Sequence, residues 1–96
     1  QLQVLWELKI NPGKADELRS ISRDLVAFIE SGELRTIACN VYINEEESLI
    51  SFKDTFADGD AFIVHSENFA SSKFGEQILE RTDGGRLCIY GTLRKH

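Results

Sequence analysis

The sequence predicts an α+β fold of the ferredoxin-like kind, in which helices cover one face of an antiparallel sheet. The hydrophobic period alternates along the chain between two residues, typical of strands, and three to four residues, typical of helices. The short acidic segment Asn44–Ser48 joins two strand-like segments as a hairpin. Together these observations predict the order βαββαβ within one domain that spans residues 1–96.

Residues 1–10 are expected to form the first strand. Their odd positions are mostly polar, and their even positions hold Leu2, Val4, Trp6, Leu8 and Ile10. This two-residue period is typical of a strand with one buried face. An amphipathic helix of about five turns is expected to follow. Asn11 is its predicted N-cap, Pro12 lies in its first turn and Gly32 ends it.

Two further strands are predicted, at Leu34–Ile43 and Leu49–Phe56. The first of them has apolar residues on both faces, so we expect both faces to be covered, one of them by another subunit. Its pattern leaves open whether the face with Cys39 or the face with Tyr42 meets the helices. In the other strand, Asp54 shares a face with three apolar residues, Ile50, Phe52 and Phe56.

The second helical region is predicted to start at Asp58–Asp60, where an aspartate can cap the helix. We expect it to break or bend at Ser66–Phe69 and to continue over residues 70–81. Asp83–Gly85 is expected to form a turn before a last strand, Arg86–Leu93.

Neither a disulfide nor a metal site is expected. The usual strand order of this plan, 4-1-3-2, puts Cys39 and Cys88 at opposite edges of the sheet, too far apart to pair. The chain has no CxxC motif, and neither His65 nor His96 sits near a cysteine in the sequence. The spacing of a zinc site is therefore missing.

Composition and charge exclude several classes of function. The chain is 42% hydrophobic and 28% charged, which is typical of a soluble globular domain. No apolar run approaches the roughly 18 residues of a membrane span, and no signal peptide is recognised, so we expect a cytoplasmic protein. The net charge of -5, from 16 acidic and 11 basic residues, disfavours nucleic-acid binding.

The helix-free face of the sheet is expected to carry an apolar patch. Its predicted members are Ile37, Cys39, Val41 and Ile43 in one strand, with Leu5 and Leu49 beside them. Exposed patches of this kind usually mark an interface. We therefore predict a homodimer in which two sheets pack face to face.

Four residues at the end of the predicted strand Leu49–Phe56 and in the helical region after it form a recognisable pattern. Asp54 stands two positions before Phe56, Ala61 follows five positions after that phenylalanine, and His65 follows nine positions after it. With the element order, this pattern resembles the antibiotic-biosynthesis-monooxygenase-like family over nearly the whole chain. The resemblance implies a dimeric α+β barrel.

The resemblance also implies an activity. Family members include monooxygenases that use no metal or organic cofactor and act on quinol-like or anthrone-like aromatics. Their substrate lies between sheet and helices, is deprotonated there, and reacts as a carbanion with oxygen. Active members carry Asn, Trp and an aromatic hydroxyl where this chain has Phe52, Phe56 and Phe62. Heme-degrading relatives carry Asn, Trp and His where this chain has Trp6, Phe56 and His65, so only the histidine agrees.

His65 is the candidate general base, and Asp54 is the candidate partner that orients it. Imidazoles titrate near neutral pH, which suits a general base, and both side chains are predicted on the helix-facing side. The competing interpretation is a structural histidine that is held by a carboxylate or a backbone carbonyl.

An aromatic cavity is expected beside these two residues, lined by Trp6, Phe52, Phe56 and Phe62, and it would suit a flat aromatic ligand. Core filling is the alternative role of the tryptophan. Asn40 and Tyr42 share one strand face. They contact the ligand if that face points inward, and the dimer interface if it points outward.

Two functions therefore remain open at this point. One is a cofactor-independent monooxygenase that acts on a small electron-rich aromatic. The other is a non-catalytic domain of the same fold that binds or senses a small ligand. They differ in whether His65 is needed for turnover or only for stability.

Overall fold

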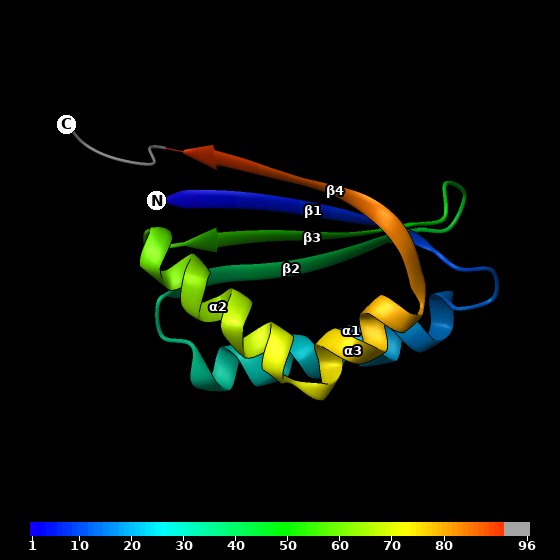
Figure 1. Ribbon diagram of the computed structural model, residues 1–96, viewed down its shortest axis with the longest axis horizontal. Coiled ribbons are helices and arrows are strands. Elements are labelled where there is room, and N and C mark those ends of the chain that lie inside the picture. Colours follow the sequence, from blue (N-terminus) through cyan, green and yellow to red (C-terminus); the bar gives the residue numbers. More distant parts are fainter. Residues whose placement is uncertain (92–96) are drawn as a thin grey trace.

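The computed structural model describes residues 1–91. Its elements are β1 (Leu2–Ile10), α1 (Ala15–Gly32), β2 (Thr36–Asn44), β3 (Leu49–Phe56), α2 (Gly59–Ser71), α3 (Lys73–Glu80) and β4 (Thr82–Gly91). The four strands form one sheet in the order β2-β3-β1-β4, and every neighbouring pair is antiparallel. The helices lie together on one face of this sheet (Figure 1). The predicted fold class and strand order are confirmed.

The core lies between the sheet and the helices, as the two-residue period of the strands predicts. A larger cluster joins β1 and β3 to α1 and α3, with Leu18, Ile50 and Ile78 fully buried. A smaller cluster lies under the start of α2 and consists of Leu2, Val4, Phe56 and Ala61. Among residues 1–91, no helix has both the length and the apolar character needed to cross a membrane.

The face of β2 that meets the helices is decided by its pairing with β3. Cys39 lies opposite Asp54 and Val41 lies opposite Phe52, and paired residues share a face of the sheet. Cys39, Val41 and Ile43 therefore pack against the helix-side cluster. The helix-free face, called the open face below, carries Ala38, Asn40 and Tyr42 instead.

The prediction of an apolar patch on the open face is thus wrong for most of its members. Of its predicted members, only Leu5 and Leu49 lie there, as their pairing with Lys53 and Lys9 shows. Ile37 sits at a bulge between Thr36 and Ala38 and is exposed.

Two helix boundaries differ from the prediction. Asn11 is not an N-cap, because its carbonyl accepts the Lys14 amide in a turn and α1 begins only at Ala15. Asp58 does cap α2, accepting the Ala61 amide at 2.9 Å. That helix runs without a break through Ser66–Phe69 and ends before Ser72, whose hydroxyl caps α3.

β4 starts earlier than predicted, and Asp83–Gly85 belongs to the strand rather than to a turn. The strand bends sharply here (Figure 1), with a pairing irregularity opposite Leu8 and Ile10. Gly84 has φ of 72°, and a Cβ at Gly85 would overlap the Glu7 carbonyl oxygen. Both positions therefore need glycine. The predicted strand end at residues 92–93 lies outside the described residues. Cys39 and Cys88 are unpaired, as predicted.

Candidate functional site

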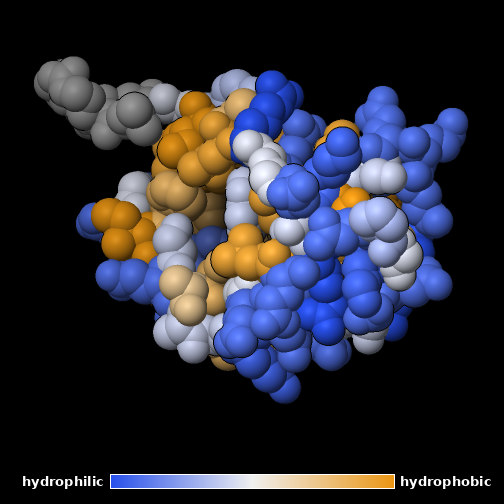
Figure 2. Space-filling view, turned by 45° about the vertical axis from the view of Figure 1, so that its right-hand side comes forward, coloured by the Kyte–Doolittle hydropathy of each residue, from blue (hydrophilic) through white to orange (hydrophobic). Residues whose placement is uncertain are grey.

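A cavity of about 280 Å³ opens between the sheet and helices α1 and α2. Figure 2 shows hydrophobic side chains gathered around a hollow in the surface. Most of the cavity wall is apolar, and it includes Val4, Trp6, Leu25, Ile29, Phe52, Phe62, Phe69 and Leu87. Polar character comes from Cys39, Asp54, His65 and Ser66. A cavity with these walls suits a flat apolar molecule that carries few polar groups.

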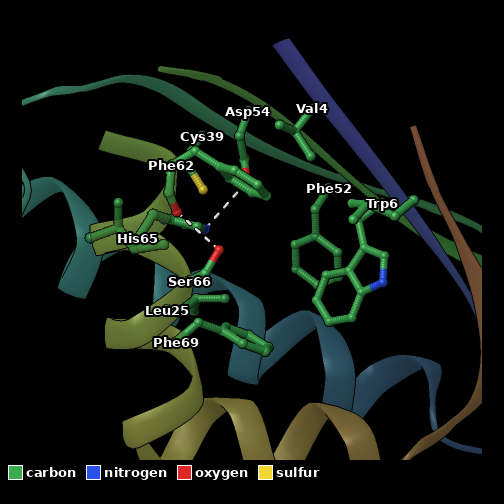
Figure 3. Close-up of a pocket in the computed structure, with 12 residues that line it drawn as sticks. Val4, Trp6, Leu25, Cys39, Phe52, Asp54, Phe62, His65, Ser66 and Phe69 are labelled. Atoms are coloured by element: carbon green, nitrogen blue, oxygen red, sulfur yellow. Dashed lines mark hydrogen bonds and ion pairs between the residues drawn. The ribbon is translucent and has the colours of Figure 1, made fainter. Parts of the chain in front are cut away.

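His65 stands on the wall of this cavity, one turn after Ala61, which anchors α2 to the sheet. Its side chain is 12% exposed and lies between two carboxylates. Nδ1 is 2.9 Å from Oε1 of Glu33. Nε2 is 3.5 Å from Oδ2 of Asp54, a contact drawn as a dashed line in Figure 3. The imidazole also packs against Phe56, with ring centroids 4.9 Å apart. Nδ1 therefore has a hydrogen-bond partner in Glu33, whereas Nε2 has the more distant Asp54 carboxylate beside it.

Glu33, the residue that ends α1, reaches under α2 to His65. Its side chain is 5% exposed and also accepts hydrogen bonds from Thr36 at 2.6 Å and Asn68 at 3.0 Å. Burial opposes its charge, but the hydrogen bonds from Thr36, Asn68 and His65 outweigh burial and lower the pKa of the carboxyl. Glu33 is therefore a buried carboxylate that stays ionised, because hydrogen bonds from the protein replace those from water.

The sequence interpretation missed Glu33, because a glutamate after a helix end is normally exposed. One signal could have indicated it. His65 and Asn68 are three positions apart and so lie on the same face of one helix. Two polar side chains on a sheet-facing stripe call for a shared buried acceptor, and Glu33 is that acceptor.

Asp54 projects from β3 toward His65 and is buried. Burial raises the pKa of its carboxyl, although the neighbouring Cys39 and the charge of His65 act in the opposite direction. Its Oδ1 atom accepts no well-directed hydrogen bond from residues 1–91. Burial, followed by the charge of Asp54, also raises the pKa of the Cys39 thiol. This thiol is therefore a neutral wall group at physiological pH.

The predicted aromatic wall is present in part. Trp6, Phe52 and Phe62 line the cavity. The indole packs on Phe52 and on Phe69, with ring centroids 5.3 Å apart in both pairs. Phe69 was not among the predicted residues. Phe56 is fully buried and does not line the cavity, because the side chains of His65 and Phe62 pack over it.

Asn40 and Tyr42 do not face this cavity. Their register places them opposite Lys53 and Ser51, on the open face. The sequence left open whether Asn40 and Tyr42 point inward to the ligand or outward. They point outward, so they are not ligand contacts in this cavity. They belong to a surface depression that also contains Leu5 and Tyr90.

The side chains of this cavity can carry out proton transfer by themselves. An imidazole between two carboxylates can take up a proton from a molecule in the cavity and hold the positive charge. The apolar walls keep water from competing for that proton. The same contacts also fasten α2 to the sheet, which is the structural role that the sequence left open.

Asp54→Asn is expected to change the pH dependence of stability in a defined direction. A carboxyl whose pKa is raised by folding stabilises the protein below its unfolded pKa, and this contribution is lost as the pH rises through the raised value. Asparagine does not titrate, so the variant does not lose stability in this way as the pH rises. Its free energy of unfolding relative to wild type should therefore be more favourable at pH 7 than at pH 4, as measured by urea denaturation. Asp24→Asn, an exposed change on α1, is the control. A relative stability that falls from pH 4 to pH 7 would contradict the raised pKa.

No family model matches the sequence, and no curated protein is significantly similar to it. Solved structures are similar in fold. A crystal structure described as an antibiotic biosynthesis monooxygenase has a TM-score of 0.79 and 16% identity, covering 98% of this chain and 100% of that one. A protein from Caulobacter crescentus CB15, described as a candidate enzyme of the same name, has a TM-score of 0.74 and 21% identity, covering 93% and 84%. A conserved protein from Methanosarcina mazei Go1 has a TM-score of 0.74 and 19% identity, covering 93% and 89%. The single-chain fold implied by the sequence resemblance is confirmed, and the dimer stays a prediction.

Proposed function

We propose that this chain is a cofactor-independent monooxygenase of the antibiotic-biosynthesis type, acting on a small electron-rich aromatic of the quinol or anthrone kind. One observation carries the proposal. A histidine held between two buried carboxylates stands on the wall of an aromatic cavity large enough for two or three fused rings. The similarity in fold to structures named antibiotic biosynthesis monooxygenase supports the same reaction class.

In the proposed reaction, Trp6, Phe52 and Phe62 hold the aromatic substrate. His65 accepts a proton from the substrate, and the electron pair of the broken bond stays on the substrate as a carbanion. The carbanion reduces bound oxygen directly. A C–O bond forms to one oxygen atom, and the O–O bond and the second C–H bond of that carbon then break to give the carbonyl. The other oxygen atom leaves as water, which takes one proton from that carbon and one from the His65 imidazolium. The imidazolium that forms is compensated by the charge of Glu33.

A second candidate function is a non-catalytic domain that binds a small aromatic. Phe52 and Phe56 stand where active relatives carry Asn and Trp, and the cavity offers few polar groups to hold a reacting oxygen species. A cavity without these polar groups favours binding of an aromatic molecule without turnover.

Oxygen uptake and binding can be measured on the same panel of anthrones, quinols and catechols. Binding is followed without oxygen through the fluorescence of Trp6, the only tryptophan in the chain. Uptake well above the rate of spontaneous oxidation supports the monooxygenase. Binding without uptake favours the binding domain. If no compound binds or reacts, both proposals for this cavity fail.

We also propose that the chain forms a homodimer through the open face. Leu5, Tyr42 and Tyr90 lie on this face, and the two tyrosines are more than half exposed in the single chain. Large amphipathic side chains of this kind are enriched in protein interfaces.

Leu5→Glu is expected to break this dimer, because it places a charge at the centre of the open face. Light scattering at micromolar concentration should give twice the chain mass for wild type and the single-chain mass for the variant. Ile63→Glu, an exposed position on α2, is the matched control and should remain dimeric. A wild-type protein of single-chain mass would refute the dimer.

A further inference from the structure

The Glu33 carboxylate lies at the end of α1 and contacts three side chains, Thr36, His65 and Asn68. Of its two carboxylate oxygens, Oε1 receives Thr36 and His65 Nδ1, and Oε2 receives Asn68. An ionised carboxylate can only accept hydrogen bonds, and its lowered pKa keeps it ionised at neutral pH. Nδ1 of His65 must therefore be the donor in this contact.

This requirement determines which tautomer of His65 is present. When the imidazole is neutral, its single proton sits on Nδ1, and Nε2 keeps a free lone pair. Nε2 is the atom on the Asp54 side, 3.5 Å from its carboxylate. Figure 3 joins His65 by a dashed line to Asp54, and both residues line the cavity. The basic atom of the histidine thus points toward the place where a ligand would lie.

We propose that Glu33 is a positioning residue that holds His65 in the Nδ1–H tautomer, so that Nε2 takes a proton from the bound molecule. The part that concerns a bound substrate rests on the proposed function. In the step itself, an O–H or C–H bond of the ligand breaks, its electron pair stays on the ligand, and the proton forms a bond to Nε2. The imidazolium then lies between Glu33 from α1 and Asp54 from β3, with the Cys39 thiol of β2 as the third ionisable group nearby.

The orientation of the His65 ring depends on Glu33, which lies at the end of α1 and outside the cavity wall. Glu33 is fixed by the end of α1, by Thr36 at the start of β2 and by Asn68 on α2. Ligating and catalytic histidines commonly have a carboxylate behind the second ring nitrogen, which sets the tautomer. Here the fold places such a carboxylate behind His65 and leaves the front of the ring at the cavity.

The tautomer can be measured by ¹⁵N NMR of the histidine side chains at alkaline pH, in the free protein and without substrate. The chain contains only two histidines, and the His65→Gln variant assigns the signals. The proposal expects a protonated Nδ1 and an unprotonated Nε2 in wild type. A wild-type imidazole that is protonated on Nε2 would overturn it, whether or not oxygen uptake is found. This measurement needs no variant of Glu33 and so does not depend on that variant folding.

Glu33→Gln removes the charge and keeps the shape. We expect the Nε2–H tautomer to become populated and the kcat of oxygen uptake to fall about tenfold or more, with KM changed much less. Glu67→Gln removes an exposed carboxylate of α2, two positions from His65, and should behave as wild type. An unchanged tautomer in a folded Glu33→Gln variant would refute the positioning role. If wild type takes up no oxygen, the NMR result still decides the tautomer, while the proposed function fails by itself.

Discussion

Oxygen uptake should fall by about 100- to 10,000-fold when His65 is replaced by alanine, which is the usual contribution of a general base. The reason is that no other basic group lies on the cavity wall at neutral pH among residues 1–91. A carboxylate is intrinsically a weaker base than an imidazole, and burial raises the pKa of the Cys39 thiol and so keeps it protonated. Binding of the aromatic, measured by Trp6 fluorescence, should change far less than the rate.

The result is informative only if the variant remains folded, because His65 also fastens α2 to Glu33 and Asp54. Thermal melting and circular dichroism are recorded in parallel, and His65→Gln provides a second variant that keeps a polar side chain of similar reach. Val64→Ala, an exposed change on the same helix, is the control and should retain full uptake. Uptake that persists in a folded His65→Ala protein would remove the histidine from the mechanism and leave the reaction class standing.

Phe56→Ala is expected to cost about 3–5 kcal/mol of folding free energy, the usual range for a buried phenylalanine. Phe56 is fully buried, and its ring supports both His65 and Phe62, with centroids 4.9 Å and 5.4 Å away. A domain of this size has a total stability of roughly 5–15 kcal/mol. Urea denaturation should therefore show a large loss, and part of the population could be unfolded without denaturant.

Phe62→Ala provides the comparison. Phe62 is only partly buried and lines the cavity, so its loss should cost less stability and should weaken ligand binding more directly. Phe28→Ala, which is 43% exposed on α1, controls for the general effect of removing an aromatic ring. If the Phe56 variant were as stable as the Phe28 variant, the packing described for this position would be wrong.

The candidate site was predictable where periodicity places a side chain. Asp54 shares the two-residue period of Phe52 and Phe56 in β3, and His65 follows Ala61 by one helical turn. Both were therefore expected on the buried side, and they do lie 3.5 Å apart. Their roles in catalysis remain predictions. Trp6, Phe52 and Phe62 were expected at the cavity for the same reason and line it.

Phe56 shows where the same period is insufficient. Alternation indicates that a side chain points inward, but it does not tell a cavity wall from a filled core. That distinction depends on which helix residues cover the side chain. Here Phe62 and His65 of α2 cover Phe56, and a ligand would meet those two residues first.

The sequence by itself determined the order of the elements, the face of β1 and β3 that is buried, and the inward direction of Asp54 and His65. Hydrophobic periods encode these properties locally, within one strand or one helix. Only the tertiary structure decided the direction of Asn40 and Tyr42, because β2 is apolar on both faces and its register with β3 selects one of them. It also decided the partner of His65, since Glu33 lies 32 positions away and meets the imidazole only when α2 packs beside the end of α1. Contacts of this kind arise from the packing of whole elements, and no local pattern records them.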